Sequence, residues 1–257
     1  MQVQACKGPA MNKVAELAPQ LERTHGATRE IEALGRNIWL VNGPEVPYLG
    51  LSLPTRMTLI RIKGQLWVHS PIPLTDSIKE FIRTIGQPAY IVAPNKLHHL
   101  HLRSWHFQYP NATLFAPPGL RKKRKDITFD FEILPDRRYQ WSDDIHHDHF
   151  KGNLFMDELV FFHRSSRTLI LTDLILNLKT DHFNWRQKLL AQFDQIRYPN
   201  GRTPRLYRYS MYTKSHAKKS YQQFLEWDPI NVVINHGACI RGNGKQEIEA
   251  RLGWLKN

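Results

Sequence analysis

The chain has 257 residues, enough for one domain with a sizeable core, and 41% of them are hydrophobic. Lysine and arginine number 36 against 23 aspartates and glutamates, which gives a formal net charge of +13 at pH 7. This excess favours anionic partners such as phosphorylated metabolites, membrane surfaces or nucleic acid. Only two cysteines are present, which excludes a disulfide scaffold and favours a reducing compartment, so we expect a cytoplasmic protein.

The N-terminal region predicts an extension. Val14, Leu17 and Leu21 have helical spacing, although a proline interrupts them. The first residues contain no hydrophobic stretch of signal-peptide length. We expect residues 1–36 to form an N-terminal extension and residues 37–257 to form a single domain.

The start of that domain predicts β structure. Residues 37–41 predict a short strand, and Pro44, Pro47 and Pro54 predict an irregular loop after it. Residues 57–69 then predict a hairpin that turns at a Lys-Gly pair.

A helix follows this hairpin. Ser77 with Glu80 three residues later is a capping-box pattern, and Gly86 predicts the helix end. Residues 103–109 predict a second, short helix, and residues 112–116 a buried strand.

The run of five cations at residues 121–125 must be solvated or bound to anions. Residues 158–162 and 168–172 predict a second hairpin. The apolar region 158–178 is not a membrane span, because charged residues interrupt it.

Helices dominate the predicted C-terminal third, where apolar residues recur at helical spacing. The apolar positions of the three predicted helices are Leu189, Leu190, Phe193 and Ile196, then Ala217, Tyr221, Phe224 and Leu225, and finally Ile248, Leu252 and Leu255.

Three short apolar segments predict buried strands, and side chains that bind metals follow each of them. The strands are residues 89–93, 168–172 and 231–235, and the side chains are His98 and His99, Asp173, and His236. Where helices flank a sheet, ligands usually bind at the carboxyl edge, because loops converge there. Three imidazoles and one carboxylate suit zinc, iron or manganese, so we predict a metal site at this edge.

Local motifs around these residues resemble the metallo-beta-lactamase superfamily, and more closely an uncharacterised branch of it that is known as a domain of unknown function. The motifs are residues 70–73 (Ser-Pro-Ile-Pro), 92–99 (Val-Ala-Pro-Asn-Lys-Leu-His-His), 162–169 with 172–174, and His236-Gly237. The resemblance covers roughly residues 35–255. It implies an α/β fold of the αββα sandwich type, with two mixed sheets flanked by helices.

The resemblance also implies a reduced metal site. With the final His of the superfamily motif His-x-His-x-Asp-His at His99, Pro94, Lys96 and His98 stand where His, His and Asp would be. The superfamily's later His falls near His149, where His-Phe-Lys-Gly is similar to its His-x-x-Gly.

Two classes of function stay open. One is a metal-dependent hydrolase of an ester, thioester, lactone or phosphodiester, with one divalent metal, foremost zinc, held by His98, His99, Asp173 and His236, with His149 as a further candidate. Its substrate is expected to be a small, anionic molecule. In this hypothesis Asp173 is catalytic and an electrophilic role is open to Lys96.

The other class is a metal-free, non-catalytic member that binds an anionic ligand or nucleic acid. Lys96 in place of a ligand favours it, because its charge repels a cation unless the amine points away. Oligomeric state has no signal in the sequence.

Overall fold

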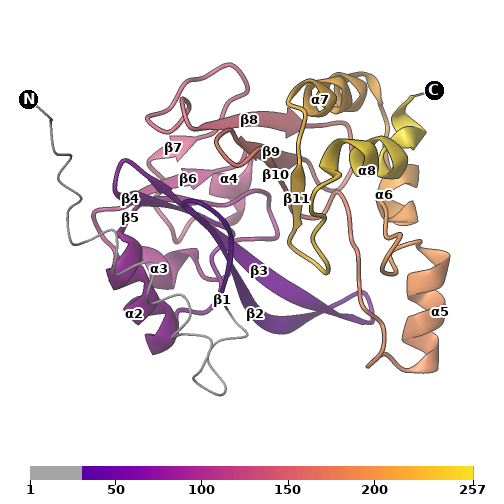
Figure 1. Ribbon diagram of the computed structural model, residues 1–257, viewed down its shortest axis with the longest axis horizontal. Helices are drawn as coiled ribbons and strands as arrows, with labels where there is room; N and C mark the ends of the chain where they lie inside the picture. Colours follow the sequence, from indigo (N-terminus) through magenta and orange to yellow (C-terminus); the bar gives the residue numbers. More distant parts are fainter. Residues whose placement is uncertain (1–30, 257) are drawn as a thin grey trace, which may run out of the picture.

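The computed structural model describes residues 31–256, and their elements form four layers, helices, sheet, sheet and helices (Figure 1). The helix predicted around Val14, Leu17 and Leu21 lies outside the described residues. Within them, no helix has both the length and the hydrophobicity of a membrane span.

The first sheet has seven strands, in the spatial order in which they follow along the chain. They are β1 (Ile31–Gly35), β2 (Ile38–Tyr48), β3 (Leu51–Ile62), β4 (Gln65–His69), β5 (Gln87–Val92), β6 (Thr113–Ala116) and β7 (Phe131–Glu132). The pairs from β1 to β4 are antiparallel, and those from β4 to β7 are parallel, so the sheet is mixed.

The second sheet has four strands and is also mixed, because its only parallel pair is β10 with β11. Its spatial order is β11 (Asn231–Ile234), β10 (Thr168–Leu171), β9 (Glu158–His163) and β8 (Ile145–Phe150). The αββα fold expected from the resemblance is therefore present.

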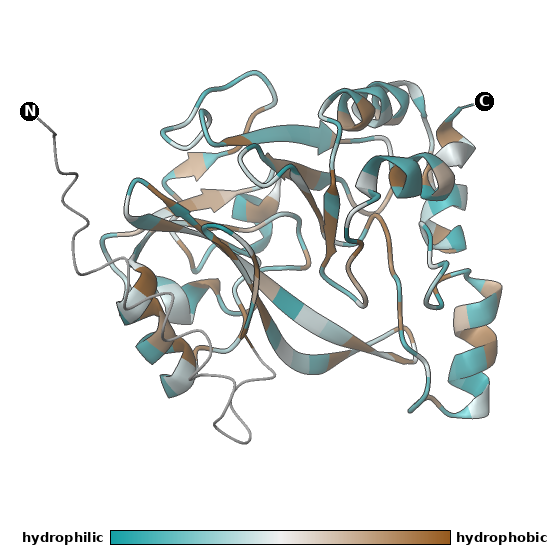
Figure 2. Ribbon diagram, in the orientation of Figure 1, coloured by the Kyte–Doolittle hydropathy of each residue, from teal (hydrophilic) through white to brown (hydrophobic). Residues whose placement is uncertain are grey.

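Helices cover the outer face of each sheet. The first sheet packs on α2 (Asp76–Ile85) and α3 (Leu102–Gln108), and the second on α7 (Ser215–Glu226) and α8 (Gly244–Arg251), through two separate clusters of buried apolar side chains. A third cluster fills the space between the sheets and includes Trp67, Phe115 and Phe161. Figure 2 shows this alternation of apolar interior and polar exterior along the ribbons.

The remaining helices are short or lie at the edge of the sandwich. They are α4 (Leu120–Lys123), α5 (Trp185–Phe193), α6 (Arg205–Tyr209) and the 3-10 turn Gly253–Leu255. In Figure 1, the tip of the long β2–β3 hairpin reaches toward α5. A hydrogen bond of 3.1 Å from Gln187 Nε2 to the carbonyl of Gly50 joins them.

Three sequence interpretations need correction. Pro44, Pro47 and Pro54 lie within β2 and β3, not in an irregular loop. Here the two strands pair with each other only, so each has a free edge where the missing N–H of proline costs no ladder bond.

The second correction concerns α2, which begins at Asp76 with Thr75 as its N-cap instead of Ser77. The Thr75 hydroxyl accepts the N–H of Ile78, so the cap lies two residues earlier than the pattern suggested. The third is that β1 falls inside residues 1–36, the range assigned to the extension, and pairs with β2. Residues 31–35 are thus part of the first sheet.

Candidate metal centre

Three of the predicted ligands converge beyond the carboxyl ends of β5, β10 and β11. The Nε2 atoms of His98 and His236 lie 3.2 Å apart. The Asp173 carboxylate places Oδ2 3.3 Å from His98 Nε2 and Oδ1 3.1 Å from His236 Nε2. These residues, called here the trio, offer ligand atoms that all lie within 4.8 Å of one another.

Asn95 organises the loop that delivers His98. Its side-chain oxygen accepts the backbone N–H groups of Leu97 and His98, at 2.8 and 3.1 Å. Its amide nitrogen donates to Asp173 Oδ2 at 2.6 Å. One buried amide therefore fixes the turn after β5 and orients the carboxylate of the trio.

Glu158 holds the loop that delivers Asp173. Its buried carboxyl oxygens accept three consecutive backbone N–H groups, from Thr172, Asp173 and Leu174, at 2.6 to 2.9 Å. Burial, and then the charge of Asp173, raise the pKa of Glu158 to about 8 against the effect of these donors. Sequence reasoning missed this residue, whose only signal is an acidic side chain at the start of a buried strand.

The segment after β11 fixes His236 through its backbone and its ring. His236 Nδ1 lies 2.7 Å from the carbonyl of Pro54, which can only accept, so Nδ1 carries the proton. In the neutral ring, the lone pair of Nε2 then faces the other two members of the trio, His98 and Asp173. Gly237 follows with φ +116°, and a Cβ there would overlap the carbonyl of Asn177, so only glycine fits.

The trio's electrostatics favour a bound cation. Burial opposes the charge on Asp173, but His98 and His236 outweigh it and hold the pKa of Asp173 well below its usual value. Burial likewise lowers the pKa of His236, but its hydrogen bond to Asp173 and the charge of Asp173 reverse the sign, so the pKa is raised. An ionised carboxylate thus faces the Nε2 atoms of His98 and His236, and its negative charge stabilises a proton or a cation beside it.

The donor set fits a divalent metal. Zinc binds nitrogen and oxygen ligands at roughly 2.0 to 2.1 Å, which for a tetrahedron places ligand atoms about 3.3 Å apart. The 3.2 Å between the two Nε2 atoms matches this edge length, and these nitrogens lie 3.1 and 3.3 Å from the two different oxygens of the Asp173 carboxylate. Two imidazoles and one carboxylate are also a known set for zinc and iron(II) in sites that keep an open position.

His99 is not gathered into the trio, although it follows His98 directly. Arg124 Nη1, which can only donate, lies 2.9 Å from His99 Nδ1, so the second ring nitrogen carries the proton of the neutral ring. Burial and then the charges of Lys123 and Arg124 lower the pKa of His99 to about 4. His99 therefore faces the cations around α4.

His149 and Lys96 also lie outside the trio. His149 is a buried residue of β8 whose pKa is lowered to about 3, first by burial and then by Lys151. The Lys96 side chain lies against Gly119, where a Cβ would be 3.1 Å from its Cε. Its carbonyl accepts a hydrogen bond from Lys123 Nζ at 2.7 Å.

A polar layer lies between the sheets beside the trio. Thr58, His69, Thr172 and Asn235 are fully buried, and each has side-chain nitrogen or oxygen atoms without a hydrogen-bond partner in the described structure. Each lies two positions along its strand from a core residue that points between the sheets, so its own side chain points between the sheets too. His69, Thr172 and Asn235 immediately precede Ser70, Asp173 and His236, and Ser70 Oγ lies 2.7 Å from His98 Nδ1. Strand periodicity from Trp67 could have predicted His69 in this layer.

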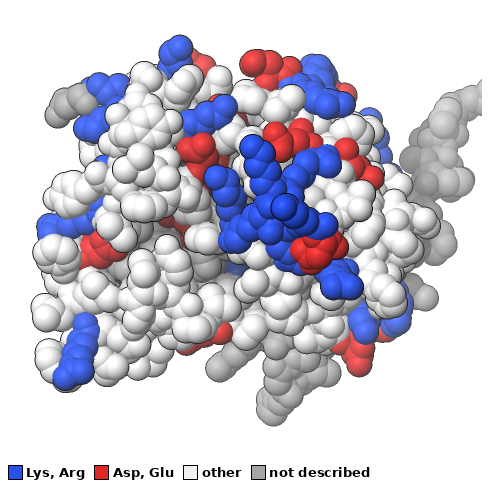
Figure 3. Space-filling model, turned by 180° about the vertical axis from the view of Figure 1, so that it is seen from behind, with Lys and Arg blue, Asp and Glu red and all other residues white. Residues whose placement is uncertain are grey.

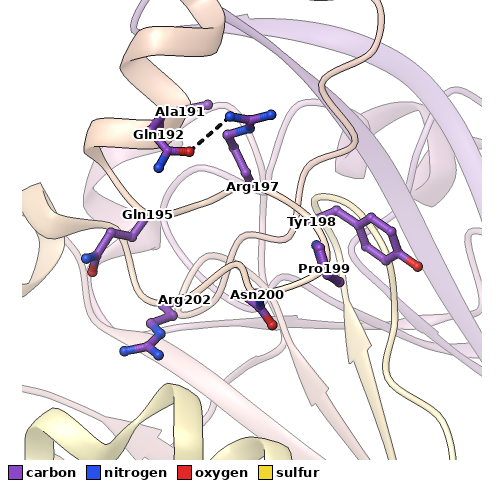
Figure 4. Close-up of a pocket in the computed structure, with 8 residues that line it drawn as sticks. All are labelled: Ala191, Gln192, Gln195, Arg197, Tyr198, Pro199, Asn200 and Arg202. Carbon is purple, nitrogen blue, oxygen red and sulfur yellow. Dashed lines mark hydrogen bonds between the residues drawn. The ribbon is translucent and has the colours of Figure 1, made fainter.

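A cavity of about 630 Å³ reaches Asp173, one member of the trio. Asp173 and Leu97, the residue before His98, contribute to its wall, and most of its other lining side chains are apolar. A second hollow, of about 360 Å³, lies at the end of α5 and contains no member of the trio (Figure 4). Its wall is more polar, with Arg197 Nη1 bonded to Gln192 Oε1 at 3.0 Å.

Two mixed sheets flanked by helices, with the trio beyond the carboxyl ends of their strands, are the metallo-beta-lactamase fold. The chain belongs to the family described as Domain of unknown function (DUF4336), whose model matches residues 37–192. This match includes His98 and Asp173 and ends before His236. No curated protein matches the sequence significantly.

Solved structures similar to this chain are metallo-beta-lactamases. DIM-1, exposed to ceftazidime, is 12% identical with a TM-score of 0.61, over 87% of this chain and 96% of that one. TMB-1 is also 12% identical with a TM-score of 0.61, over 89% and 98%. FIM-1 from Pseudomonas aeruginosa, in a mono-zinc form, is 11% identical with a TM-score of 0.61, over 88% and 94%. At such identities the likeness establishes the fold.

Proposed function

We propose that this protein is a metal-dependent hydrolase with a single metal site held by His98, Asp173 and His236. The observation that carries the proposal is the convergence of two imidazole Nε2 atoms and one carboxylate within 3.3 Å of one another. The fold adds support, since one similar structure is named as a mono-zinc form. We expect zinc, with iron or manganese as alternatives.

The bound metal would supply Lewis acidity and lower the pKa of a water molecule toward neutrality. Asp173 supplies negative charge and stays ionised, because its pKa is well below the usual value. His236 donates from Nδ1 to the carbonyl of Pro54, so that its Nε2 atom is available for the metal. Asn95 and Glu158 hold the two loops so that little reorganisation is needed when the metal binds.

The reaction class is hydrolysis of an ester, thioester, lactone or phosphodiester. The cavity lined by Asp173 supports this proposal, because its volume suits a small organic substrate. Lys96, whose amine lies toward Gly119, is proposed only as an auxiliary electrophile, to be tested by Lys96→Met.

A panel of chromogenic esters, thioesters, lactones and phosphodiesters, assayed with zinc-, iron- and manganese-loaded protein, tests this function. We expect hydrolysis of one class that a chelator abolishes and that the same metal restores. Asp173→Asn should lower kcat/KM at least 100-fold, whereas the exposed control Asp181→Asn should leave it unchanged. Activity that is equal in the two variants would contradict the proposal.

The second candidate function is binding of an anionic ligand or nucleic acid without catalysis. Lys and Arg side chains gather at the centre of the rear face (Figure 3). The cations of residues 121–125 lie in α4 and just after its C-terminus. Two of these cations already have partners, however, since Arg124 binds Asp126 and His99, and Lys123 binds the Lys96 carbonyl. Binding to DNA or RNA that weakens steeply with salt, without any metal uptake, would favour this function over hydrolysis.

A further inference from the structure

The cavity that reaches Asp173 of the trio has mostly apolar walls. Its inner wall is made of buried Leu51, Leu53, Leu176, Met156 and Ile196, which are at most 9% exposed. Its volume of about 630 Å³ lies within the range of sites that enclose a small organic ligand. Asp173, a member of the trio, also lines the cavity.

Large apolar side chains surround the mouth of the cavity and are exposed to solvent. Phe193 is 63% exposed, Leu206 56% and Phe155 71%. The apolar spacing of residues 189–196 predicts an amphipathic helix, yet α5 ends at Phe193 and buries only Ala191. Leu190 and Phe193 of α5 line the cavity instead of joining a core, which gives α5 a face without a partner in the described structure.

The charged groups of the outer wall are already engaged. Arg205 lies over the ring of Phe193, with its guanidinium carbon 4.9 Å from the ring centroid. Asp194 Oδ1 accepts the backbone N–H of Leu206 at 3.3 Å. Both charged groups of the outer wall therefore have contacts within the protein, whereas Asp173 lines the cavity as a member of the trio.

From these observations we infer that the substrate is an ester or thioester of a medium- or long-chain carboxylic acid, with its alkyl chain in this cavity and its carbonyl at the trio. The reaction rests on the proposed function. Water adds its oxygen to the acyl carbon, and the bond from that carbon to the alcohol oxygen or thiol sulfur breaks. The leaving group takes the proton, which releases a carboxylic acid and an alcohol or thiol.

Chain length should control the rate. Each methylene group removed from water stabilises the bound acyl chain enough to raise kcat/KM about fourfold until the cavity is full. With metal-loaded protein and 4-nitrophenyl acetate, butyrate, octanoate and decanoate, we expect kcat/KM to rise at least about 100-fold from acetate to octanoate. A flat series, or one that falls with length, would overturn the inference.

Binding of a dansyl-labelled long-chain fatty acid, followed by fluorescence, tests the cavity without catalysis. The double variant Phe193→Gln/Leu206→Gln should weaken binding at least tenfold, because both side chains line the mouth. The matched control is Leu189→Gln, which changes a residue of α5 that is 62% exposed and absent from the cavity wall. It should bind as the wild type does.

The two assays separate the inference from the proposed function. Saturable binding that the double variant weakens, with no ester hydrolysed, supports the apolar cavity and contradicts the hydrolase. Hydrolysis without chain-length preference, together with fatty-acid binding that the double variant does not weaken, supports the hydrolase and overturns the cavity assignment. Because all three glutamine substitutions are at exposed positions, loss of folding is not expected, and circular dichroism checks it.

Discussion

The chain has two histidine-rich segments of similar composition, residues 98–101 and 146–149, and they have different structural roles. The first follows the end of β5, where a turn made by Asn95 lets His98 face Asp173 and His236. The second lies within β8, so the pleat of the strand fixes the direction of each ring.

Within β8, the neighbouring layers decide what each histidine contacts. The ring of His146 packs near Phe162 and Trp227, and that of His147 packs against Tyr139 and Trp141. His147 Nε2 also lies 3.0 Å from the carbonyl of Leu134. A histidine beyond a strand end is thus available for a site, whereas one inside a strand is used for packing.

The largest effect is expected from Glu158, whose carboxyl group holds Asp173 in place. Glu158 lies in β9, the strand that pairs with β8 and its histidine-rich segment. Glu158→Leu leaves three buried backbone N–H groups unpaired, at a cost of roughly 1 to 3 kcal/mol each. We expect a loss of at least about 3 kcal/mol in the free energy of unfolding, measured by urea denaturation. Glu158→Gln, which keeps one acceptor, should lose less. Equal losses would show that the hydrogen bonds are not the cause.

Asn95 provides the next test, because the turn that it makes gives the first histidine-rich segment a different role from the second. Asn95→Ala removes the donor to Asp173 and the acceptor for two loop N–H groups. By analogy with other groups that orient metal ligands, we expect metal affinity to fall roughly 10- to 100-fold. Titration with zinc in competition with a chelator measures it. Unchanged affinity would mean that the loop is held without Asn95.

His149 tests the packing role of the second segment through pH. Its pKa is about 3 in the folded protein and about 6.5 in the unfolded chain, so below pH 6.5 the unfolded chain binds a proton that the folded protein does not. The free energy of unfolding therefore falls as the pH decreases, by about 2 kcal/mol from this residue between pH 7 and 5. Denaturation of wild type and His149→Leu at pH 7 and pH 5 should show a smaller pH effect in the variant. An equal pH effect would remove His149 as a contributor.

The smallest effect is expected at His101, the last histidine of the first segment. It is partly exposed and precedes α3 without a side-chain capping bond. His101→Ala should change the free energy of unfolding by less than about 0.5 kcal/mol and leave the metal content as in the wild type. A loss of metal would extend the site toward α3.

Strand ends were the informative feature of the sequence. The apolar runs before His98, Asp173 and His236 predicted three strands and their common edge, because short buried strands have a clear apolar pattern. The pattern could not separate His98 from His99, since the distinction depends on Arg124, a residue from a different element. Nor could it find Glu158, whose role depends on the pairing of β9 with β10. Of the polar layer, strand periodicity reaches only His69, because the layer itself forms when the two sheets pack.

The spacing of apolar residues also could not predict what the apolar face of α5 contacts. Leu190 and Phe193 have the periodicity of core residues, yet they line an open cavity. Periodicity reports that a helix has an apolar side, but not what covers it.

The most direct test of the metal centre is elemental analysis of untagged wild type, His98→Ala and His236→Ala, with His99→Ala and His149→Leu as controls. We expect about one equivalent of zinc, iron or manganese in the wild type and in both controls, and none in the first two variants, while circular dichroism shows that all five proteins are folded. Wild-type protein that takes up no metal after reconstitution, or controls that lose the metal as completely as His98→Ala, would contradict a site built from His98, Asp173 and His236.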